Sequence, residues 1–244
     1  MPTKIKLSIV LPAYNEEKII ENTLNEILRY LNNKKYSWEV VVADDGSKDK
    51  TSQIVKKFSD RGVRLVRLLK NKGKGGALRE GMLKARGEYV IFMDADLSVP
   101  LENLDVFLKK LDAGSDVVIA SRRIKGAVIL VHQPFIREAM GRVFTLLTRF
   151  LTSVHEVVDF TCGFKGFSNI AAKKIFTNSQ INRWAYDAEI IFLAKKYGFS
   201  INQSPITWKN REDSRVRLKS IVLETFRDLL KVRINDLQGK YENN

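Results

Sequence analysis

The chain has 244 residues and is poor in cysteine and histidine, which excludes several kinds of chemistry. Its single cysteine, Cys162, can form neither an intrachain disulfide nor a zinc site built from cysteines, and such a composition suits a reducing compartment. The two histidines, His132 and His155, lie outside every motif described below. We therefore do not expect a catalytic histidine.

Long apolar runs are also absent. No stretch reaches the about 18 consecutive apolar residues of a membrane-spanning helix, so we expect none. The first residues, Met-Pro-Thr-Lys-Ile-Lys, lack the apolar centre of a signal peptide, so we expect no secretion signal. A hydrophobic fraction of 44% and this chain length fit one globular domain with at most a small elaboration.

Acidic residues are outnumbered, and the formal net charge is +14. The excess is clustered: residues 61–86 carry nine Lys/Arg against one acid, residues 121–149 six against one, and residues 209–233 eight against four. A clustered positive charge indicates an anionic partner. Nucleic acid is one such partner, and a non-catalytic basic module that binds nucleic acid or membrane is therefore an alternative to an enzyme.

Two observations argue against nucleic acid. The chain carries no recognisable nucleic-acid-binding motif, and its aromatic residues are scattered rather than interleaved with Lys and Arg. An anionic membrane surface together with phosphorylated substrates accounts for the same charge. We therefore expect no nucleic-acid partner.

The first 120 residues alternate between two kinds of pattern. Apolar runs of strand length occur at residues 5–11, 40–43, 63–69, 89–93 and 117–120. Segments with helical periodicity lie between them, at residues 16–31, 48–58 and 76–85, with Ser47 as the expected N-cap of the second. This α/β alternation predicts an open, mainly parallel, Rossmann-like sheet with crossover helices.

Polar motifs follow four of these strands, each at the carboxyl end. They are residues 12–16, 44–47, 71–76 and 94–96. Ligands of open α/β sheets bind outside the carboxyl ends of the strands, so the four motifs are expected to meet at one crevice.

Asp94 and Asp96 form an Asp-x-Asp pair directly after the strand at residues 89–93. Two carboxylates on one short loop can hold Mg²⁺ or Mn²⁺ and leave coordination positions open for the oxygens of a diphosphate. The loop Asn71-Lys-Gly-Lys-Gly-Gly76 can cradle an anion with its backbone amides, although it lacks the Gly-Lys-Ser/Thr ending of a Walker motif.

Taken together, the motifs resemble those of the inverting family 2 glycosyltransferases of GT-A fold. Asp159-Phe-Thr-Cys-Gly-Phe-Lys165 and Arg183-Trp-Ala-Tyr-Asp-Ala-Glu189 are similar to segments of the synthases that make dolichyl-phosphate glucose or mannose. The resemblance covers residues 6–217 and implies metal-dependent, inverting transfer of a hexose from a nucleotide sugar to a polyprenyl phosphate. It favours UDP-glucose as donor, with GDP-mannose as the alternative.

The resemblance also assigns residues to the donor site. Asp96 is implied to be the closer metal ligand, and Asp94 reaches either the ribose or the metal through water. The residues implied to bind the nucleotide sugar and its metal are Pro12, Ala13, Tyr14, Glu16, Asp44, Asp45, Lys74, Asp94, Ala95, Asp96, Arg211 and Arg215. Of these, Arg211 and Arg215 belong to a basic loop expected to close over the diphosphate.

The implied acceptor is already anionic and needs no general base, so cationic side chains matter more. Arg122, Arg123 and Arg137 are the candidates for gripping the lipid phosphate, because guanidinium groups bind phosphate with two parallel hydrogen bonds. Asp187 occupies the place of a catalytic base in relatives with hydroxyl acceptors. Here it is expected either to bind sugar hydroxyls or to orient Arg122.

We expect a catalytic domain at residues 1–217, with a nucleotide-sugar half (1–120) and an acceptor half (121–217), followed by a helix and polar tail at residues 218–244. Residues 134–151 and 220–232 read as helices. The apolar face of the first, which includes Ile136, Val143, Phe144, Leu147, Phe150 and Leu151, suits either core packing or a membrane interface. The predicted location is peripheral, on the cytoplasmic face of a membrane.

Overall fold

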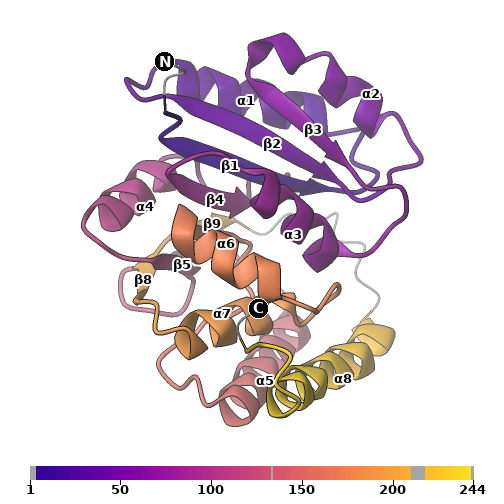
Figure 1. Cartoon of the computed structure of the whole chain (residues 1–244), viewed down its shortest axis with the longest axis vertical. Coiled ribbons are helices and arrows are strands. Elements are labelled where there is room, and N and C mark those ends of the chain that lie inside the picture. The colour runs from indigo at the N-terminus through magenta and orange to yellow at the C-terminus, as the bar shows by residue number, and fades with distance from the viewer. Residues whose placement is uncertain (1–3, 133, 210–217, 243–244) are drawn as a thin grey trace.

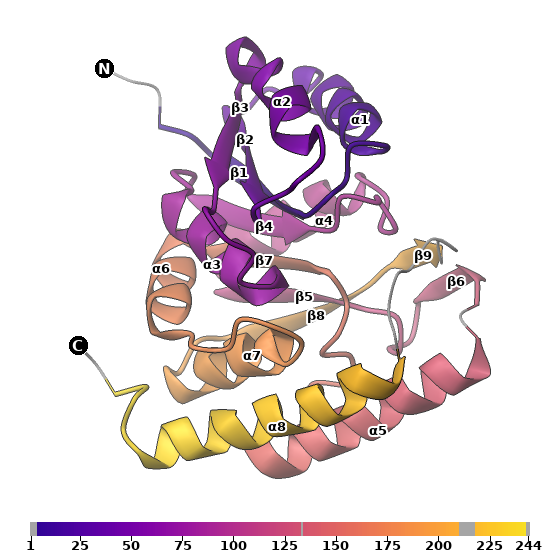
Figure 2. The ribbon, with the colours of Figure 1, turned by 90° about the vertical axis from the view of Figure 1, so that its right-hand side faces the viewer.

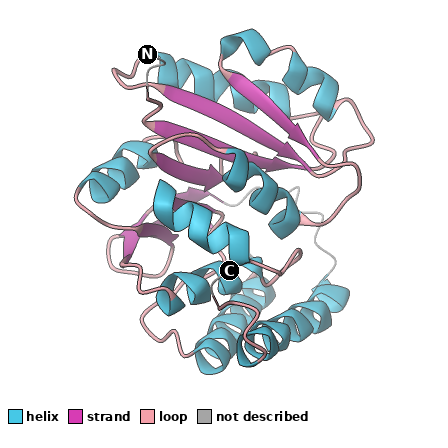
Figure 3. Cartoon of the chain, in the orientation of Figure 1, coloured by secondary structure: helices cyan, strands magenta, loops and turns pink. Residues whose placement is uncertain are grey.

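The alternating apolar runs form a seven-stranded sheet with helices on both faces (Figures 1 and 3). The computed structural model describes residues 4–132, 134–209 and 218–242. The strands of the sheet are β1 (Leu7–Ala13), β2 (Trp38–Asp44), β3 (Val63–Arg67), β4 (Tyr89–Met93), β5 (Val117–Ser121), β7 (Phe164–Ser168) and β8 (Ile201–Pro205). Two further strands, β6 (Val128–Val131) and β9 (Thr207–Lys209), pair as a separate small sheet.

The strand order is β3-β2-β1-β4-β7-β5-β8. Every neighbouring pair is parallel except the two made by β7, which runs antiparallel to both β4 and β5. The chain builds β2 and β3 on one side of β1 and then returns to place β4 on the other side. The carboxyl ends of β1 and β4 therefore flank the point where strand order reverses, which is the usual place for a ligand.

Alternation along each strand divides the core into two apolar clusters. Leu7, Ile9 and Leu11 of β1 face the cluster that includes α1 (Ile20–Asn32), α2 (Thr51–Lys56) and α4 (Asn103–Asp112). Val10 faces the opposite cluster, which includes α3 (Lys74–Lys84), α6 (Asn169–Asn178) and α7 (Tyr186–Lys196). A short 3₁₀ helix, Ser59–Arg61, links α2 to β3.

Two long helices form an outer layer beyond α7. These are α5 (Phe135–Thr152) and α8 (Leu218–Leu237), and they pack side by side at the end of the molecule away from α1 and α2 (Figure 2). None of the helices within the described residues is long and apolar enough to cross a membrane.

The five predicted strands and the five predicted helices are all present, with ends shifted by a few residues. Ser47 is not the N-cap of α2, because the helix begins later, after Lys50. The Ser47 hydroxyl instead accepts a hydrogen bond from the amide of Asn15 at 2.9 Å. Elements outside the predicted pattern are α4, α6, α7, β6, β7, β8 and β9, and the two halves of the predicted catalytic domain share one sheet through β7.

Candidate active site

Asp94 lies directly after β4, and its backbone is held by the loop that follows and by the segment before β7. The amide of Asp94 donates to the carbonyl of Gly163 (3.1 Å), and the amide of Leu97 donates to the carbonyl of Asp94 (3.3 Å). A Cβ added at Gly163 would overlap the Asp94 carboxylate, so glycine is required there. Leu97 adopts a left-handed backbone (φ 53°) that closes the turn.

Asp96 follows on the same loop, and its side chain is half-buried. Its Oδ1 accepts from the amide of Ser98 (2.9 Å), and the carbonyl of Ala95 accepts from the hydroxyl of Thr23 on α1 (2.6 Å). Within the described part of the chain, Asp96 Oδ2 has no protein partner. One carboxylate oxygen is therefore presented on a loop that is itself tied down.

Asp94 and Asp96 fit a hard divalent cation, because carboxylate oxygens are the ligands that Mg²⁺ and Mn²⁺ prefer. No group of three or more His, Cys, Asp or Glu side chains that could enclose a metal occurs among the described residues. A cation at this loop would therefore complete its coordination with water or with oxygens of a bound ligand. Such an incomplete site suits a metal that arrives with a diphosphate.

Lys74 begins α3 and places its ammonium 2.5 Å from Asp94 Oδ1. The ammonium also lies 5.9 Å from the centre of the Tyr186 ring. Although the Lys74 side chain is only partly buried, desolvation of its ammonium opposes the charge, and the nearby carboxylates of Asp94 and Asp187 outweigh this and raise the pKa of Lys74 well above its usual value. Lys74 is therefore a permanent cation at the amino end of a helix, where an anion is favoured.

The Asp44-Asp45 pair supports the loops around this site. Buried Asp44 accepts from the amide of Ser47 (2.8 Å) and from the hydroxyl of Ser52. Its side chain is fully buried, so a nucleotide could contact this carboxylate only if the surrounding loops moved. Asp45 accepts from the amides of Lys72 (2.7 Å) and Gly73 (2.8 Å), so it holds the glycine-rich loop.

The first motif lies against the second, as the sheet topology requires. Pro12 and Ala13 are the last residues of β1, and Tyr14 beyond them is exposed. The amide of Glu16 donates to the hydroxyl of Thr51 (2.8 Å), while the left-handed turn at Asn15 (φ 55°) directs the chain toward Ser47. The predicted convergence of the four strand-end motifs is confirmed.

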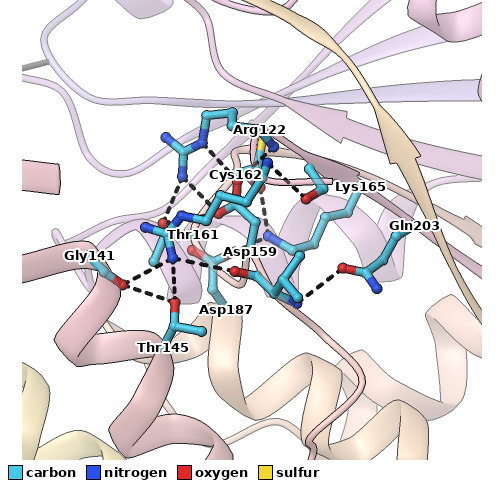
Figure 4. A network of polar contacts seen from close by, with 12 residues as sticks. Arg122, Gly141, Thr145, Asp159, Thr161, Cys162, Lys165, Asp187 and Gln203 are labelled. Atoms are coloured by element: carbon cyan, nitrogen blue, oxygen red, sulfur yellow. Dashed lines mark hydrogen bonds and ion pairs between the residues drawn. The ribbon is translucent and has the colours of Figure 1, made fainter. Parts of the chain in front are cut away.

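Arg122, directly after β5, is oriented by Asp159 and not by Asp187 (Figure 4). Its Nε and Nη2 each donate to the Asp159 carboxylate at 2.8 Å, and Nη2 also donates to Thr161 (2.9 Å). Although burial opposes ionisation, the guanidinium lowers the pKa of Asp159 to about 2. The guanidinium centre lies 5.3 Å from the Trp208 ring.

Asp187 pairs instead with Lys165, a buried lysine on β7 (Figure 4). The Lys165 ammonium also donates to the carbonyl of Cys162 at 2.7 Å. Burial raises the pKa of Asp187, and the positive charges of Lys165 and Lys74 counteract this. Of its two predicted roles, orienting Arg122 is therefore wrong, and binding sugar hydroxyls stays a prediction.

The sequence motif that contains Asp159 and Lys165 carried no assigned role for either residue. One sequence signal could have revealed them: a charged residue stands at each end of a segment of otherwise apolar or small residues. Charged side chains in such a segment are buried only when they are paired. Cys162, between them, is buried, and burial raises its pKa to about 12. It is a packing residue.

The other predicted arginines differ in position. Arg123 turns toward α5, where its Nη1 donates to Thr145 (2.8 Å) and to the carbonyl of Val158 (3.3 Å). These bonds tie α5 to the segment before β7 and give Arg123 a structural role. Arg137 lies within α5, but its side chain is outside the described part, as are Arg211 and Arg215.

Comparison with known proteins agrees with this geometry. The dolichyl-phosphate beta-glucosyltransferase of Homo sapiens is 34% identical over 256 residues, which cover 98% of this chain and 78% of that protein. The dolichyl-phosphate beta-glucosyltransferase of Dictyostelium discoideum is 32% identical over 251 residues, which cover 96% of this chain and 76% of the relative.

The fold recurs in a solved structure of glucosyl-3-phosphoglycerate synthase from Mycobacterium tuberculosis in complex with Mn²⁺ and UDP-glucose. The TM-score is 0.64 at 20% identity, with 95% of this chain and 78% of that chain covered, which shows a shared GT-A fold. The family model for glycosyl transferase family 2 matches residues 8–176, from β1 to α6. The strand-end carboxylates, the sheet topology and this match together show that the chain belongs to glycosyl transferase family 2.

Proposed function

We propose that this chain transfers glucose from UDP-glucose, with inversion, to the phosphate of dolichol or another polyprenol. Membership of the family makes the chain a glycosyltransferase, so a non-catalytic basic module is no longer an alternative. The observation that carries the proposal is the carboxylate pair Asp94 and Asp96 at the switch point of the sheet, beside the cation of Lys74.

On the donor side, the residues stabilise the negative charge that develops on the departing diphosphate. Asp94 and Asp96 would hold a divalent cation, which supplies charge neutralisation to the leaving group. Lys74 and the amides at the start of α3 add positive potential to the same place. A divalent cation held by Asp94 would compete with Lys74 for that carboxylate, and the Lys74 ammonium would then be available to a phosphate oxygen.

On the acceptor side, Arg122 is the candidate for binding the lipid phosphate. Its Nε and Nη2 are engaged by Asp159, whereas Nη1 has no partner among the described residues. The segment from Asp159 to Gly163 contacts both Arg122 and Asp94, so it links the acceptor cation to the donor loop. A phosphate monoester is already anionic, so the pairing of Asp187 with Lys165 does not deprive the reaction of a base.

The names of the relatives support this donor and acceptor. Two dolichyl-phosphate beta-glucosyltransferases match almost the whole chain, and the structural neighbour was solved with Mn²⁺ and UDP-glucose. We infer UDP as the nucleotide, with Mg²⁺ or Mn²⁺ as the metal.

The test is a transfer assay with purified protein. Labelled UDP-glucose and GDP-mannose are each offered with dolichyl or undecaprenyl phosphate, in Mg²⁺, Mn²⁺ or chelator. We expect a β-linked lipid-phosphate glucose only with UDP-glucose and metal. Mannose transfer, together with stronger competition by GDP than by UDP, would assign the donor to GDP-mannose, and transfer of neither sugar would overturn the proposal.

We further propose that the protein acts at the cytoplasmic face of a membrane without crossing it. Exposed apolar side chains form a stripe along α5: Phe135, Ile136, Val143, Leu146 and Phe150. The adjacent α8 adds a second set: Phe226, Leu230, Ile234 and Leu237. Two packed helices with exposed apolar stripes and a basic flank suit the interface of an anionic bilayer.

The predicted apolar face of α5 is thus split in two. Phe144, Leu147 and Leu151 pack against the core, whereas Val143 and Phe150 are exposed. Liposome flotation tests the membrane proposal: we expect the protein to float with anionic vesicles, and failure to float even with polyprenyl phosphate present would contradict it.

A further inference from the structure

Glu189 ends the Arg183–Glu189 motif and has no role in the mechanism described above. Its carboxylate is buried and forms no ion pair with a described lysine or arginine. It accepts hydrogen bonds from the amides of Gln180 (2.7 Å) and Ile181 (2.8 Å) and from the hydroxyl of Tyr241 (2.6 Å). A buried carboxylate without a cation depends on such donors, so each of the three bonds matters.

Tyr241 belongs to the segment that follows α8, and it returns to the body of the protein. Its side chain is fully buried and packs against Phe192 of α7, with ring centres 6.0 Å apart. Its backbone carbonyl accepts from the hydroxyl of Tyr197 at 2.9 Å. Two tyrosine hydroxyls therefore attach the C-terminal segment to α7. The hydroxyl of Tyr241 donates to Glu189, whereas the hydroxyl of Tyr197 donates to the carbonyl of Tyr241.

The loop that Glu189 holds lies directly against the glycine-rich loop. The amide of Gly76 donates to the carbonyl of Asn182 at 3.1 Å. A Cβ added at Gly75 would lie 2.7 Å from the carbonyl oxygen of Ile181, so the two backbones touch. Arg79 of α3 reinforces this contact, because its Nη2 donates to Asn182 Oδ1 at 2.9 Å.

The glycine-rich loop in turn sets the place of Lys74. Its amides at Lys72 and Gly73 are fixed from the other side by Asp45, and Lys74 extends from it to Asp94. The position of Lys74 thus depends on two supports, one from Asp45 and one from residues 180–182. The second support depends on Glu189, whose buried charge depends on Tyr241.

We propose that Tyr241 is a positioning residue for donor binding: its hydroxyl holds Glu189, Glu189 holds residues 180–182, and these set the glycine-rich loop and Lys74. The inference rests on the proposed function, because it takes the glycine-rich loop as the diphosphate site. It assigns the C-terminal segment, about 170 residues away in sequence from Lys74, a part in substrate affinity.

The experiment compares Tyr241→Phe with the matched variant Tyr197→Phe in the full chain. Each loses one hydroxyl bond of the C-terminal segment, but only Tyr241→Phe loses a bond to Glu189. Two properties are measured: the KM and kcat for UDP-glucose, and the hydrogen exchange of the peptide covering residues 72–82. A loss of folded protein alone would lower the apparent kcat and leave KM unchanged.

We expect Tyr241→Phe to raise KM by about threefold to tenfold with little change in kcat, as for one lost hydrogen bond to a charged group. Exchange of residues 72–82 should be faster in this variant and unchanged in Tyr197→Phe. Equal effects in the two variants, or none in Tyr241→Phe, would overturn the inference. If the wild type transfers no sugar, the proposed function fails, and hydrogen exchange alone then decides the positioning role.

Discussion

At the scale of single residues, buried and half-buried ion pairs distinguish this site. Arg122 pairs with Asp159, Lys165 with Asp187, and Lys74 with Asp94. The first two pairs are buried or largely buried, whereas the side chains of Lys74 and Asp94 are each more than a third exposed. The exposed pair is the one that can exchange its partner for a substrate or a metal.

The first prediction concerns Asp96. Asp96→Asn retains an oxygen that can accept from Ser98 but removes the charge needed for a cation, so the fold should persist while kcat falls by about 100-fold or more. Glucosyl transfer at saturating Mn²⁺ and the melting temperature are the measurements. Glu102→Gln, an exposed acid before α4, is the control. A near-normal rate for Asp96→Asn would place the cation elsewhere.

The second prediction concerns pH and Asp159. The pKa of Asp159 is lowered to about 2 in the folded protein, so its ionised form contributes stability that is present above the unfolded pKa of 3.8 and is lost as pH falls toward 2. The shift corresponds to about 2 kcal/mol. The difference in free energy of unfolding between wild type and Asp159→Asn should therefore shrink between pH 5 and pH 2, since protonation makes the wild type resemble the variant.

Urea denaturation at several pH values measures this difference. Asp60→Asn, at an exposed position in the 3₁₀ helix, provides the comparison and should track the wild type throughout. If the free energy of unfolding of the wild type exceeds that of Asp159→Asn by the same amount at pH 2 and at pH 5, the Arg122 pair does not stabilise the fold through its charge.

At the scale of elements, α5 has two faces with different partners. Phe144 and Leu147 lie against the core, and Arg123 and Thr145 secure the helix to the segment before β7. Its opposite face carries an apolar stripe, and α8 beside it carries another. An apolar stripe exposed along two packed helices favours an interfacial role over a purely structural one.

The third prediction tests this stripe. Phe135 and Phe150 are 82% and 79% exposed, so Phe135→Ser/Phe150→Ser should leave stability nearly unchanged and reduce flotation with anionic vesicles by about tenfold or more. Ile170→Ser on α6 alters a residue of similar exposure (77%) outside the stripe and should float as the wild type does. Equal flotation of all three proteins would show that α5 does not enter the membrane.

At the scale of the whole molecule, the net charge of +14 and the apolar stripes would be two separate sources of the proposed membrane affinity. The charge term is screened by salt, whereas the apolar term is not. The basic segment at residues 121–149 overlaps most of α5, so both terms would act at the same end of the protein.

The fourth prediction follows from combining the two. Flotation with anionic vesicles should decrease between about 0.1 M and about 0.5 M salt but persist at the higher value, because apolar burial remains. Neutral vesicles should bind more weakly and show little dependence on salt. Complete release at high salt would show that binding depends on charge alone. Flotation with anionic vesicles that does not change with salt would show that charge does not contribute to binding.

The sequence by itself determined the first five strands of the sheet and the place of the site. The periodicities of strands and helices involve neighbouring residues, so β1 to β5 and α1 to α3 could be predicted from the sequence. The strand-end motifs, which include Asp94 and Asp96, could therefore only meet at one edge of the sheet. Elements with weaker periods, among them α6, α7 and β7, were not predicted. Arg211 and Arg215 lie outside the described residues, so their predicted contact with the diphosphate stays a prediction.

Tertiary structure decided which charge meets which. Arg122 and Asp159 are 37 positions apart, Lys165 and Asp187 are 22 apart, and Glu189 and Tyr241 are 52 apart. These pairings depend on β7 entering antiparallel between β4 and β5 and on the chain returning over α7 after α8. The physical reason is that a buried charge pairs with whichever group the packed elements place beside it. Short-range sequence patterns carry no information about that neighbour.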